Sequence, residues 1–406
     1  MSETKQTQGR EEEADAALRN TQFSRGTMWF LVGFFVLTIA SVPLIQLFYG
    51  APPDASLDAI PTGEQLKKLE KSVETSSVAM AGVRPKTQEV LTTTFRAGNE
   101  QVVIGSGGWL FYRQGIDALA GEGFLEPRAL KARLKNTYSV PDPIAGILDL
   151  KAQLSRRGIA LIIMPVPDKA TIYPEKLWPS RADGEAPPQN HSFDAFKRAL
   201  DAKGVLVYDA TDTMWKGKTH LKKAQYFPLD THWTPIAIDL CANDLATMIE
   251  KYVPLPPRVP VNYIRRPIHA VDPGDLLRLL GLPKNQKKFH PTSVAPQAVK
   301  KPNGPILAPE RSADVLVLGD SFSGAYTEVG AGLPQQLAFY LGRPVDQLGV
   351  ANGGSLGARS KLRDLMKKGD DRLAGKKLVI YEFVARDLAF GNWKPIELKP
   401  AHKNAT

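Results

Sequence analysis

The chain has 406 residues, of which 43% are hydrophobic and 23% charged, and its 52 basic and 42 acidic side chains give a net charge of +10. A chain of this size and composition buries a large core and has room for two or three domains. Its single cysteine, Cys241, excludes a disulfide within the chain. The sequence has no CxxC pair and no cluster of His and Cys residues, so we expect no metal site.

The first strong feature is a run of 22 residues without charge, Met28 to Tyr49. A helix of this length spans the core of a bilayer, so we predict a transmembrane anchor at residues 28–49. The flanking charges differ in sign, with Arg19 and Arg25 before the run and Asp54 and Asp58 after it. Positive flanks stay in the cytoplasm, which makes residues 1–27 a cytoplasmic tail and places the rest outside. A cleaved signal peptide is the alternative, but its apolar region is normally shorter.

Residues 50–100 begin with prolines and continue with a polar, helix-permissive run, so we expect a stalk. The globular part, residues 101–393, opens with a predicted hairpin at 102–112. Beyond it, helices are predicted at 144–157, 193–202, 234–251, 333–341 and 360–368, and strands at 159–164, 205–208, 315–318, 345–348 and 378–383. This alternation predicts an α/β fold, a mostly parallel sheet flanked by helices. Residues 394–406 remain as a tail.

Proline and basic residues dominate the segment 252–312, which we interpret as an irregular insertion. Part of it is strongly basic, with Arg265, Arg266, Arg278, Lys284, Lys287, Lys288, Lys300 and Lys301 against Asp272 and Asp275. A basic surface attracts polyanions. The sequence has no nucleic-acid-binding motif, so we expect an acidic polysaccharide or anionic lipid headgroups rather than nucleic acid. A solvated, lysine-rich loop is the alternative.

A candidate nucleophile follows the strand predicted at 315–318. The apolar run ends at Gly319-Asp320-Ser321, with Gly324 close behind. A strand that stops at Gly-x-Ser can hold the serine on a sharp turn at the carboxyl edge of the sheet. The backbone N–H groups that follow such a turn point outward and can stabilise an oxyanion. Alternatively, Asp320 and Ser321 only cap a helix.

A candidate base lies upstream of this serine. Among the six histidines, His232 alone has a carboxylate two residues away, that of Asp230. A serine hydroxyl needs a base to remove its proton, and a carboxylate can hold the imidazole in the required tautomer. The two side chains can meet only in a turn or an extended segment, and Pro228 and Pro235 bracket such a segment. An Asp–His pair that only stabilises a turn is the alternative.

These motifs occur together with several others, in the order Gly107-Gly-Trp-Leu-Phe111, Pro167-Asp-Lys169, Tyr173-Pro174, Asp230-Thr-His-Trp233, Gly274-Asp-Leu276, Gly319-Asp-Ser-Phe-Ser323 and Glu382-Phe-Val-Ala-Arg-Asp-Leu388. In this set the chain resembles the alginate O-acetyltransferase (AlgJ/AlgX-like) family of SGNH-hydrolase-like domains, across residues 101–390. The resemblance implies an SGNH-hydrolase-like fold. It also implies an enzyme that moves acetyl groups onto hydroxyls of an exported polysaccharide such as alginate.

The resemblance further implies roles for single residues. Ser321 would be the nucleophile, His232 the base and Asp230 the residue that orients the base. Plain SGNH esterases keep their histidine after the serine, whereas here it comes before, as in the acetyltransferase branch. Weaker candidates for oxyanion stabilisation or substrate binding are Asn352, Arg386 and Tyr326. For Arg386 a structural ion pair is the alternative, and for Tyr326 it is packing.

The resemblance implies no cofactor, because acetyl would be delivered by a partner, a membrane-bound O-acyltransferase. It also implies a bacterial inner-membrane location, with a single membrane span and the catalytic domain in the periplasm. Two other functions stay open. The same residues would serve a polysaccharide deacetylase or esterase with water as acceptor, and the chain would alternatively be a non-catalytic glycan-binding subunit of an export complex. The basic segment favours an acidic polymer, while neutral glycans remain open.

Overall fold

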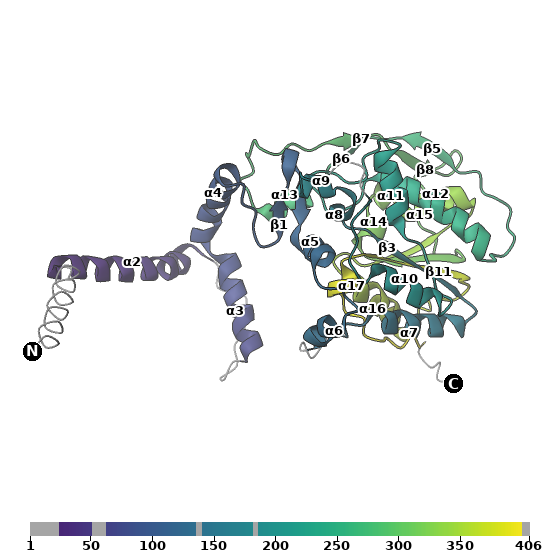
Figure 1. Ribbon diagram of the computed structural model, residues 1–406, viewed down its shortest axis with the longest axis horizontal. Coiled ribbons are helices and arrows are strands. Elements are labelled where there is room, and N and C mark those ends of the chain that lie inside the picture. The colour runs from purple at the N-terminus through teal and green to yellow at the C-terminus, as the bar shows by residue number, and fades with distance from the viewer. Residues whose placement is uncertain (1–23, 51–61, 135–139, 182–185, 400–406) are drawn as a thin grey trace, which may run out of the picture. The chain divides into compact units, whose positions relative to one another are not determined.

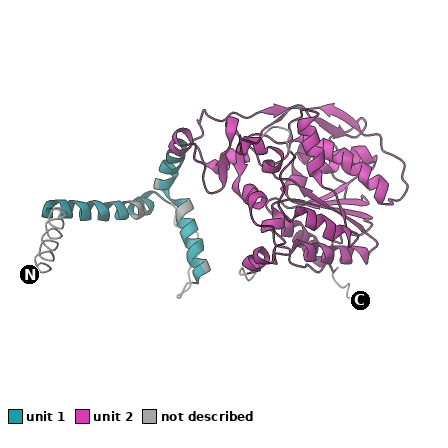
Figure 2. Cartoon of the chain, viewed as in Figure 1, with its two compact units in different colours: residues 1–89 teal, residues 90–406 magenta. Residues whose placement is uncertain are grey.

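The computed structural model describes residues 24–50, 62–134, 140–181 and 186–399. The chain divides into two compact units, residues 1–89 and 90–406 (Figure 2). Most of the predicted cytoplasmic tail, 1–23, and the end of the predicted C-terminal tail, 400–406, lie outside the described residues.

The first unit is helical where it is described. α2 (Arg25–Tyr49) begins at the N-cap Ser24, whose side chain accepts a hydrogen bond from the first turn. Within it, Arg25–Gln46 is long and apolar enough to cross a membrane by length and composition, a test that signal sequences also pass. The segment expected to be a stalk contains two helices, α3 (Gly63–Ser76) and α4 (Val78–Thr94), of which α4 continues into the second unit.

The second unit is built around a parallel sheet of five strands in the order β10-β9-β11-β3-β4. The strands are β3 (Ala160–Val166), β4 (Leu206–Val207), β9 (Val315–Gly319), β10 (Asp346–Gly349) and β11 (Leu378–Val384). Every residue of β9 and β11 is buried, as continuous apolar runs predict for strands covered on both faces. β11 is the last strand in the sequence, yet Leu378 pairs with Val315 on one side and Ala160 on the other. The predicted α/β class with a mostly parallel sheet is confirmed.

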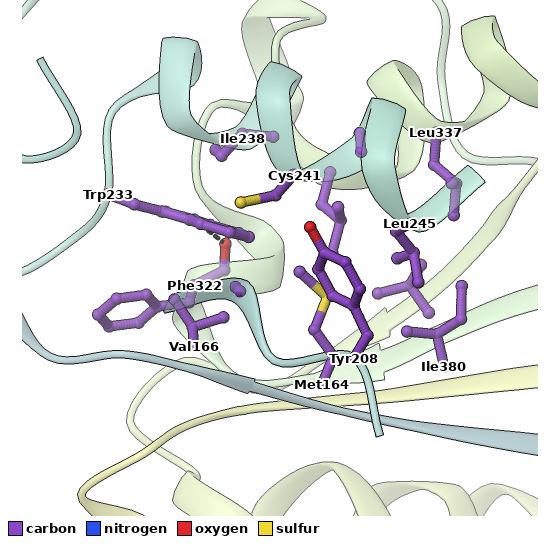
Figure 3. Packing of buried hydrophobic residues seen from close by; sticks show 14 of the residues in the cluster. Met164, Val166, Tyr208, Trp233, Ile238, Cys241, Leu245, Phe322, Leu337 and Ile380 are labelled. Atoms are coloured by element: carbon purple, nitrogen blue, oxygen red, sulfur yellow. Dashed lines mark hydrogen bonds between the residues drawn. The ribbon is translucent and has the colours of Figure 1, made fainter. Parts of the chain in front are cut away.

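Helices cover both faces of this sheet. One face is covered by α11 (Ala210–Thr219), α12 (Pro235–Tyr252) and α15 (Leu333–Leu341), and the other by α7 (Pro143–Ser155), α10 (Phe193–Asp201) and α16 (Gly354–Lys367) (Figure 1). Successive residues of a strand point to opposite faces. Ile380 therefore packs in the layer of α12 and α15 with Cys241 and Leu337 (Figure 3). Tyr381 packs on the other side of the sheet.

The start of α12 agrees with its sequence signals. Thr234 is the N-cap and its side chain accepts the N–H of Ala237, while Pro235 is the first helical residue. The N-cap of α12 therefore lies two residues after His232.

The segment expected to be an irregular insertion contains ordered elements. They are β5 (Ile264–Pro267), β6 (Ala270–Val271), α13 (Asp275–Leu280), β7 (Ser293–Val294) and β8 (Gln297–Lys300). β5 pairs with β8 and β6 with β7, both antiparallel. This segment is ordered by backbone pairing between strands some thirty positions apart in the sequence. Such long-range pairing leaves no apolar periodicity from which it could be predicted. Arg265 is less available to bind a polyanion, because its guanidinium forms an ion pair with Asp239 and donates a hydrogen bond to Gln336.

The remaining elements are short. The predicted hairpin is confirmed as β1 (Val102–Ile104) paired antiparallel with β2 (Leu110–Tyr112). The other helices and turns are η1 (Ser106–Gly108), α5 (Arg113–Ala120), α6 (Pro127–Leu134), α8 (Lys169–Ile172), α9 (Pro174–Leu177), α14 (Ser321–Gly324), η2 (Thr327–Val329) and α17 (Asp387–Phe390). Of these, α14 starts at the carboxyl end of β9 and carries the candidate nucleophile.

Candidate active site

Ser321 is the first residue of α14, directly after the buried strand β9. Asp320 caps the helix, and its carboxylate oxygen Oδ1 accepts the N–H of Phe322 at 2.8 Å. The capping interpretation is therefore correct for Asp320, and the cap leaves Ser321 half-exposed at the sheet edge. Gly319 is required before this turn, because a Cβ there would overlap the carboxylate of Glu382 and lie 2.7 Å from Ser323 Oγ.

His232 joins this serine to a buried carboxylate. Its Nε2 lies 3.0 Å from Ser321 Oγ, and its Nδ1 lies 2.8 Å from Asp230 Oδ1. The same oxygen of Asp230 also accepts the backbone N–H of His232 at 2.9 Å. Since a carboxylate can only accept, Nδ1 carries the proton and Nε2 is free to accept the serine hydroxyl proton. The structure thus brings the three leading sequence candidates into one hydrogen-bonded row.

A clasp between neighbouring residues holds the two halves of this row together. Trp233, next to His232, is fully buried and donates its indole N–H to the carbonyl oxygen of Phe322, next to Ser321, at 3.0 Å (Figure 3). The ring of Phe322 is also 4.8 Å from that of His232. The base and the nucleophile come from segments 89 positions apart, so this contact fixes their spacing.

The electrostatics of the pair favour proton uptake by the imidazole. Burial would lower the pKa of His232, but its hydrogen bond to Asp230 and the charges of Asp230, Asp275 and Asp320 together raise that pKa above 6.5. Burial would raise the pKa of Asp230, but the hydrogen bond and charge of His232 bring it below its ordinary value. The carboxylate of Asp230 can therefore stabilise an imidazolium that forms at His232.

Asp275 was not among the sequence candidates, although it lies in the quoted motif Gly274-Asp-Leu276. Its backbone N–H donates to Asp230 Oδ2 at 2.9 Å, and its own carboxylate accepts the N–H of Thr231 at 2.7 Å and the Thr231 hydroxyl. These reciprocal bonds fix the turn that carries Asp230 and His232. Burial and the charge of Asp230 raise the pKa of Asp275.

Among the described residues, one group of side chains has the spacing of a metal site: Asp230, His232 and Asp275, with ligand atoms within 4.8 Å of one another. Both ring nitrogens of His232 already have partners, however, in Asp230 and Ser321. A cation at this position would have to displace the Asp230–His232 bond.

A cleft of about 480 Å³ opens beside Ser321 and His232. This volume is within the usual range of small-molecule sites. Acidic and basic side chains both reach the cleft, among them Glu328 and Arg278, together with Tyr326.

The outward N–H groups expected after the serine turn are not available as predicted. The N–H of Phe322 donates to Asp320, and the N–H of Ser323 donates to the buried carboxyl of Glu382 at 3.1 Å. The expectation is wrong for these two groups, because the carboxyl groups of Asp320 and of Glu382 in β11 already accept them. The N–H of Ser321 is the one that remains at this helix start.

The three weaker candidates differ in their positions. Tyr326 lines the cleft in a left-handed conformation (φ 59°), and its buried hydroxyl has no hydrogen-bond partner among the described residues. Asn352 is exposed, also left-handed (φ 57°), and is not part of the cleft lining, unlike its neighbour Ala351. Arg386 lies outside the cleft and forms a 2.7 Å ion pair with Asp168. For Arg386 the structural alternative is the one observed.

Known proteins resemble this chain over most of its length. The family model of the SGNH hydrolase-like domain of the acetyltransferase AlgX matches residues 102–385. A probable alginate O-acetylase AlgJ from Azotobacter vinelandii is 27% identical over 308 residues, which cover 73% of this chain and 72% of that protein. A protein of the same description from Pseudomonas aeruginosa is 28% identical over 161 residues, 39% of this chain and 36% of the relative.

Two solved structures share the fold. The O-acetyltransferase domain of Pseudomonas putida AlgJ superposes with a TM-score of 0.53 at 21% identity, covering 72% of this chain and 93% of that domain. Pseudomonas aeruginosa AlgX superposes with a TM-score of 0.50 at 18% identity, covering 71% of this chain and 65% of AlgX. The family match spans most of the chain and the whole of its sheet, and the chain therefore belongs to the AlgX family of SGNH hydrolase-like acetyltransferases.

Proposed function

We propose that this chain transfers acetyl groups to hydroxyls of an exported polysaccharide through an acetyl-serine intermediate on Ser321. The observation that carries the proposal is the row from Ser321 Oγ through His232 to the buried Asp230, at 3.0 and 2.8 Å, beside an open cleft. Nucleophile, base and orienting carboxylate in hydrogen-bond reach are what covalent acyl transfer needs.

In the first half-reaction, Ser321 Oγ attacks the carbonyl carbon of an acetyl donor while His232 Nε2 takes the hydroxyl proton. Asp230 stabilises the imidazolium that results. The N–H of Ser321, which donates no hydrogen bond within the described residues, would stabilise the negative charge on the tetrahedral oxygen. The intermediate then collapses, the imidazolium returns its proton to the leaving group, and acetyl remains on Ser321.

In the second half-reaction, a sugar hydroxyl in the cleft attacks the acetyl-serine carbonyl. His232 takes the hydroxyl proton, and on collapse it returns this proton to Ser321 Oγ. The sugar leaves as an acetyl ester and the enzyme is restored. With water in place of the sugar, the same steps would release acetate, so the fate of the acetyl group distinguishes transfer from deacetylation.

We propose alginate as the acceptor and a membrane-bound O-acyltransferase as the source of acetyl. The described relatives are probable alginate O-acetylases, and this supports the choice of polymer. No cofactor is invoked. The family resemblance supports the acyltransferase partner, which would supply acetyl at the outer side of the membrane.

We propose that α2 anchors the protein in the bacterial inner membrane with a single span and the catalytic unit in the periplasm. The length and apolar composition of Arg25–Gln46 support this. Alkaline phosphatase fused after residue 60 should be active, because that enzyme needs an oxidising compartment. An inactive fusion, together with an active cytoplasmic reporter at the same position, would reverse the orientation. Recovery of a chain without residues 25–46 would show cleavage instead.

The test of the mechanism uses full-length protein in detergent, an activated acetyl ester and oligosaccharides of mannuronate, guluronate or neutral hexoses. Intact-mass analysis should find one acetyl on the wild type, on the peptide that holds Ser321, and none on Ser321→Ala. The matched control is Ser323→Ala in the same peptide, since Ser323 is fully buried and its hydroxyl donates to a carbonyl. Acetyl retained at full level on Ser321→Ala contradicts the mechanism. Acetyl found on a uronate oligosaccharide identifies transfer, and free acetate alone identifies hydrolysis.

A further inference from the structure

A carboxyl group with no part in these two half-reactions lies directly beneath the nucleophile turn. Glu382 is the fifth residue of β11, the middle strand of the sheet, and it is fully buried. The strand around it is apolar, so this side chain interrupts an otherwise continuous hydrophobic run. Carboxyl groups are almost never fully buried without a specific partner.

Its partners are the two backbone N–H groups that flank the nucleophile. Glu382 Oε2 accepts the N–H of Asp320 at 3.2 Å and the N–H of Ser323 at 3.1 Å, one residue before and two residues after Ser321. The side chain occupies the space that Gly319 leaves by having no Cβ. One oxygen atom therefore fixes the turn from both sides.

The surroundings of Glu382 disfavour a charge on it. Within the described part of the chain it forms no ion pair, and its second oxygen, Oε1, has no hydrogen-bond partner. The charges of Asp320 and Asp387 act on Glu382 and oppose a charge there. The nearby cation, Arg386, is paired with Asp168 and also acts on Asp320 and Asp387. Burial, and then the charge of Asp320, raise the pKa of Glu382 well above its ordinary value.

We propose that Glu382 is a positioning residue for acetyl transfer, which acts as an uncharged carboxylic acid and holds Ser321 at hydrogen-bond distance from His232. The proposal rests on the proposed function of Ser321 as nucleophile. Without the acceptor oxygen, the N–H groups of Asp320 and Ser323 would be buried and unsatisfied. The turn would then rearrange to find other acceptors, and the 3.0 Å approach of Ser321 to His232 would be lost.

Two substitutions of similar length separate hydrogen bonding from charge. In Glu382→Gln, the amide oxygen accepts both N–H groups and no charge can form. In Glu382→Met, an apolar side chain fills the space without an acceptor. The experiment measures the rate of Ser321 acetylation by an activated acetyl ester in full-length protein, its pH dependence, and backbone hydrogen exchange of residues 319–324.

The glutamine variant should react within about threefold of the wild-type rate, with the same acidic midpoint and the same hydrogen exchange. The methionine variant should react about a hundredfold more slowly, because small displacements of a nucleophile cost this much. Its KM for the ester should change little, since the cleft lining is intact, and its exchange at 319–324 should rise. Thermal unfolding of both variants checks that they fold.

Several results would overturn the proposal. One is a wild-type rate in Glu382→Met; another is a glutamine variant as slow as the methionine variant. A shift of the acidic midpoint by more than about half a pH unit in Glu382→Gln would show that the native carboxyl is charged and acts on His232. If the wild type itself acquires no acetyl on Ser321, the proposed function fails. Hydrogen exchange of the methionine variant then still decides whether Glu382 holds the turn.

Discussion

Replacing Asp230 with asparagine removes one charge from the site without changing the size of the side chain. In the wild type, Asp230 Oδ1 accepts two hydrogen bonds from His232, and Oδ2 accepts the N–H of Asp275 at 2.9 Å. An amide offers one acceptor oxygen and one NH₂ group. Whichever way the new amide turns, its NH₂ group meets an N–H donor, from His232 on one side or from Asp275 on the other.

The size of the effect follows from these contacts. Asp230 is 1% exposed, so solvent does little to replace the lost partner. A hydrogen bond to a charged group contributes about 1.5–3 kcal/mol, and a buried unsatisfied donor costs about 1–3 kcal/mol more. Together they raise the barrier for Ser321 acetylation by about 2.5–6 kcal/mol, which at 1.36 kcal/mol per decade is a loss of about two to four decades in rate.

The assay is the initial rate of acetyl-enzyme formation as a function of pH, followed by intact mass. The reaction needs neutral His232, so the rate should rise with pH, and because the pKa of His232 is raised, the wild-type midpoint should lie above the ordinary range of a histidine. In Asp230→Asn the burial of His232 remains, while the main contribution that raises its pKa is gone, so the midpoint should move to lower pH. The charges of Asp275 and Asp320 limit this movement.

The matched control is Asp201→Asn, which removes one carboxylate from an exposed position in α10. Its rate and its midpoint should equal those of the wild type. An Asp230→Asn rate within tenfold of the wild type, or a midpoint that stays in place, would refute the assignment of Asp230 as the residue that orients and stabilises His232.

Two further substitutions test the support of the site, and a triple variant tests the basic segment. Trp233→Phe removes the indole donor and leaves the carbonyl of Phe322 buried without a partner, so the free energy of unfolding should fall by about 2–4 kcal/mol in chemical denaturation; a loss below 1 kcal/mol would contradict the clasp. Gly319→Ala forces a Cβ against Glu382 and should cost about 1–3 kcal/mol and slow acetylation, whereas Gly63→Ala, with no positive φ and no atom within 4 Å of the new Cβ, is the packing control. If the basic segment binds an anionic glycan, the affinity should fall as the salt concentration rises, because salt screens exposed charges within about 8 Å. Replacing three exposed lysines of this segment with alanine should make the affinity less dependent on salt. An unchanged salt slope would remove from the binding surface the three lysines Lys284, Lys287 and Lys288.

The parts of the fold that could be predicted are those with local signals. The runs that became β3, β9 and β11 are apolar and continuous, and the start of α12 has both a threonine cap and a proline. The serine and the Asp–His pair were also local signals: one is a strand-to-turn motif, and the other spans three residues. The contact between them joins segments 89 positions apart. Its prediction therefore depended on the family resemblance.

The parts that escaped prediction depend on long-range pairing. Arg386 pairs with Asp168 across 218 positions, and Glu382 reaches the turn at Ser323 across 59. No local pattern specifies such partners. The antiparallel strand pairs of the basic segment also escaped prediction, because their strands of two to four residues are too short to show a hydrophobic periodicity.

The position of β11 has a consequence for how this chain can fold. β9 and β10 pair with each other, as do β3 and β4, and within the described residues the two pairs meet only through β11, which follows all four strands in the sequence. Contacts of such wide sequence separation make folding slow. A chain that emerges N-terminus first therefore holds two incomplete half-sheets with open edges until residue 384 is released, and needs protection from association during that interval.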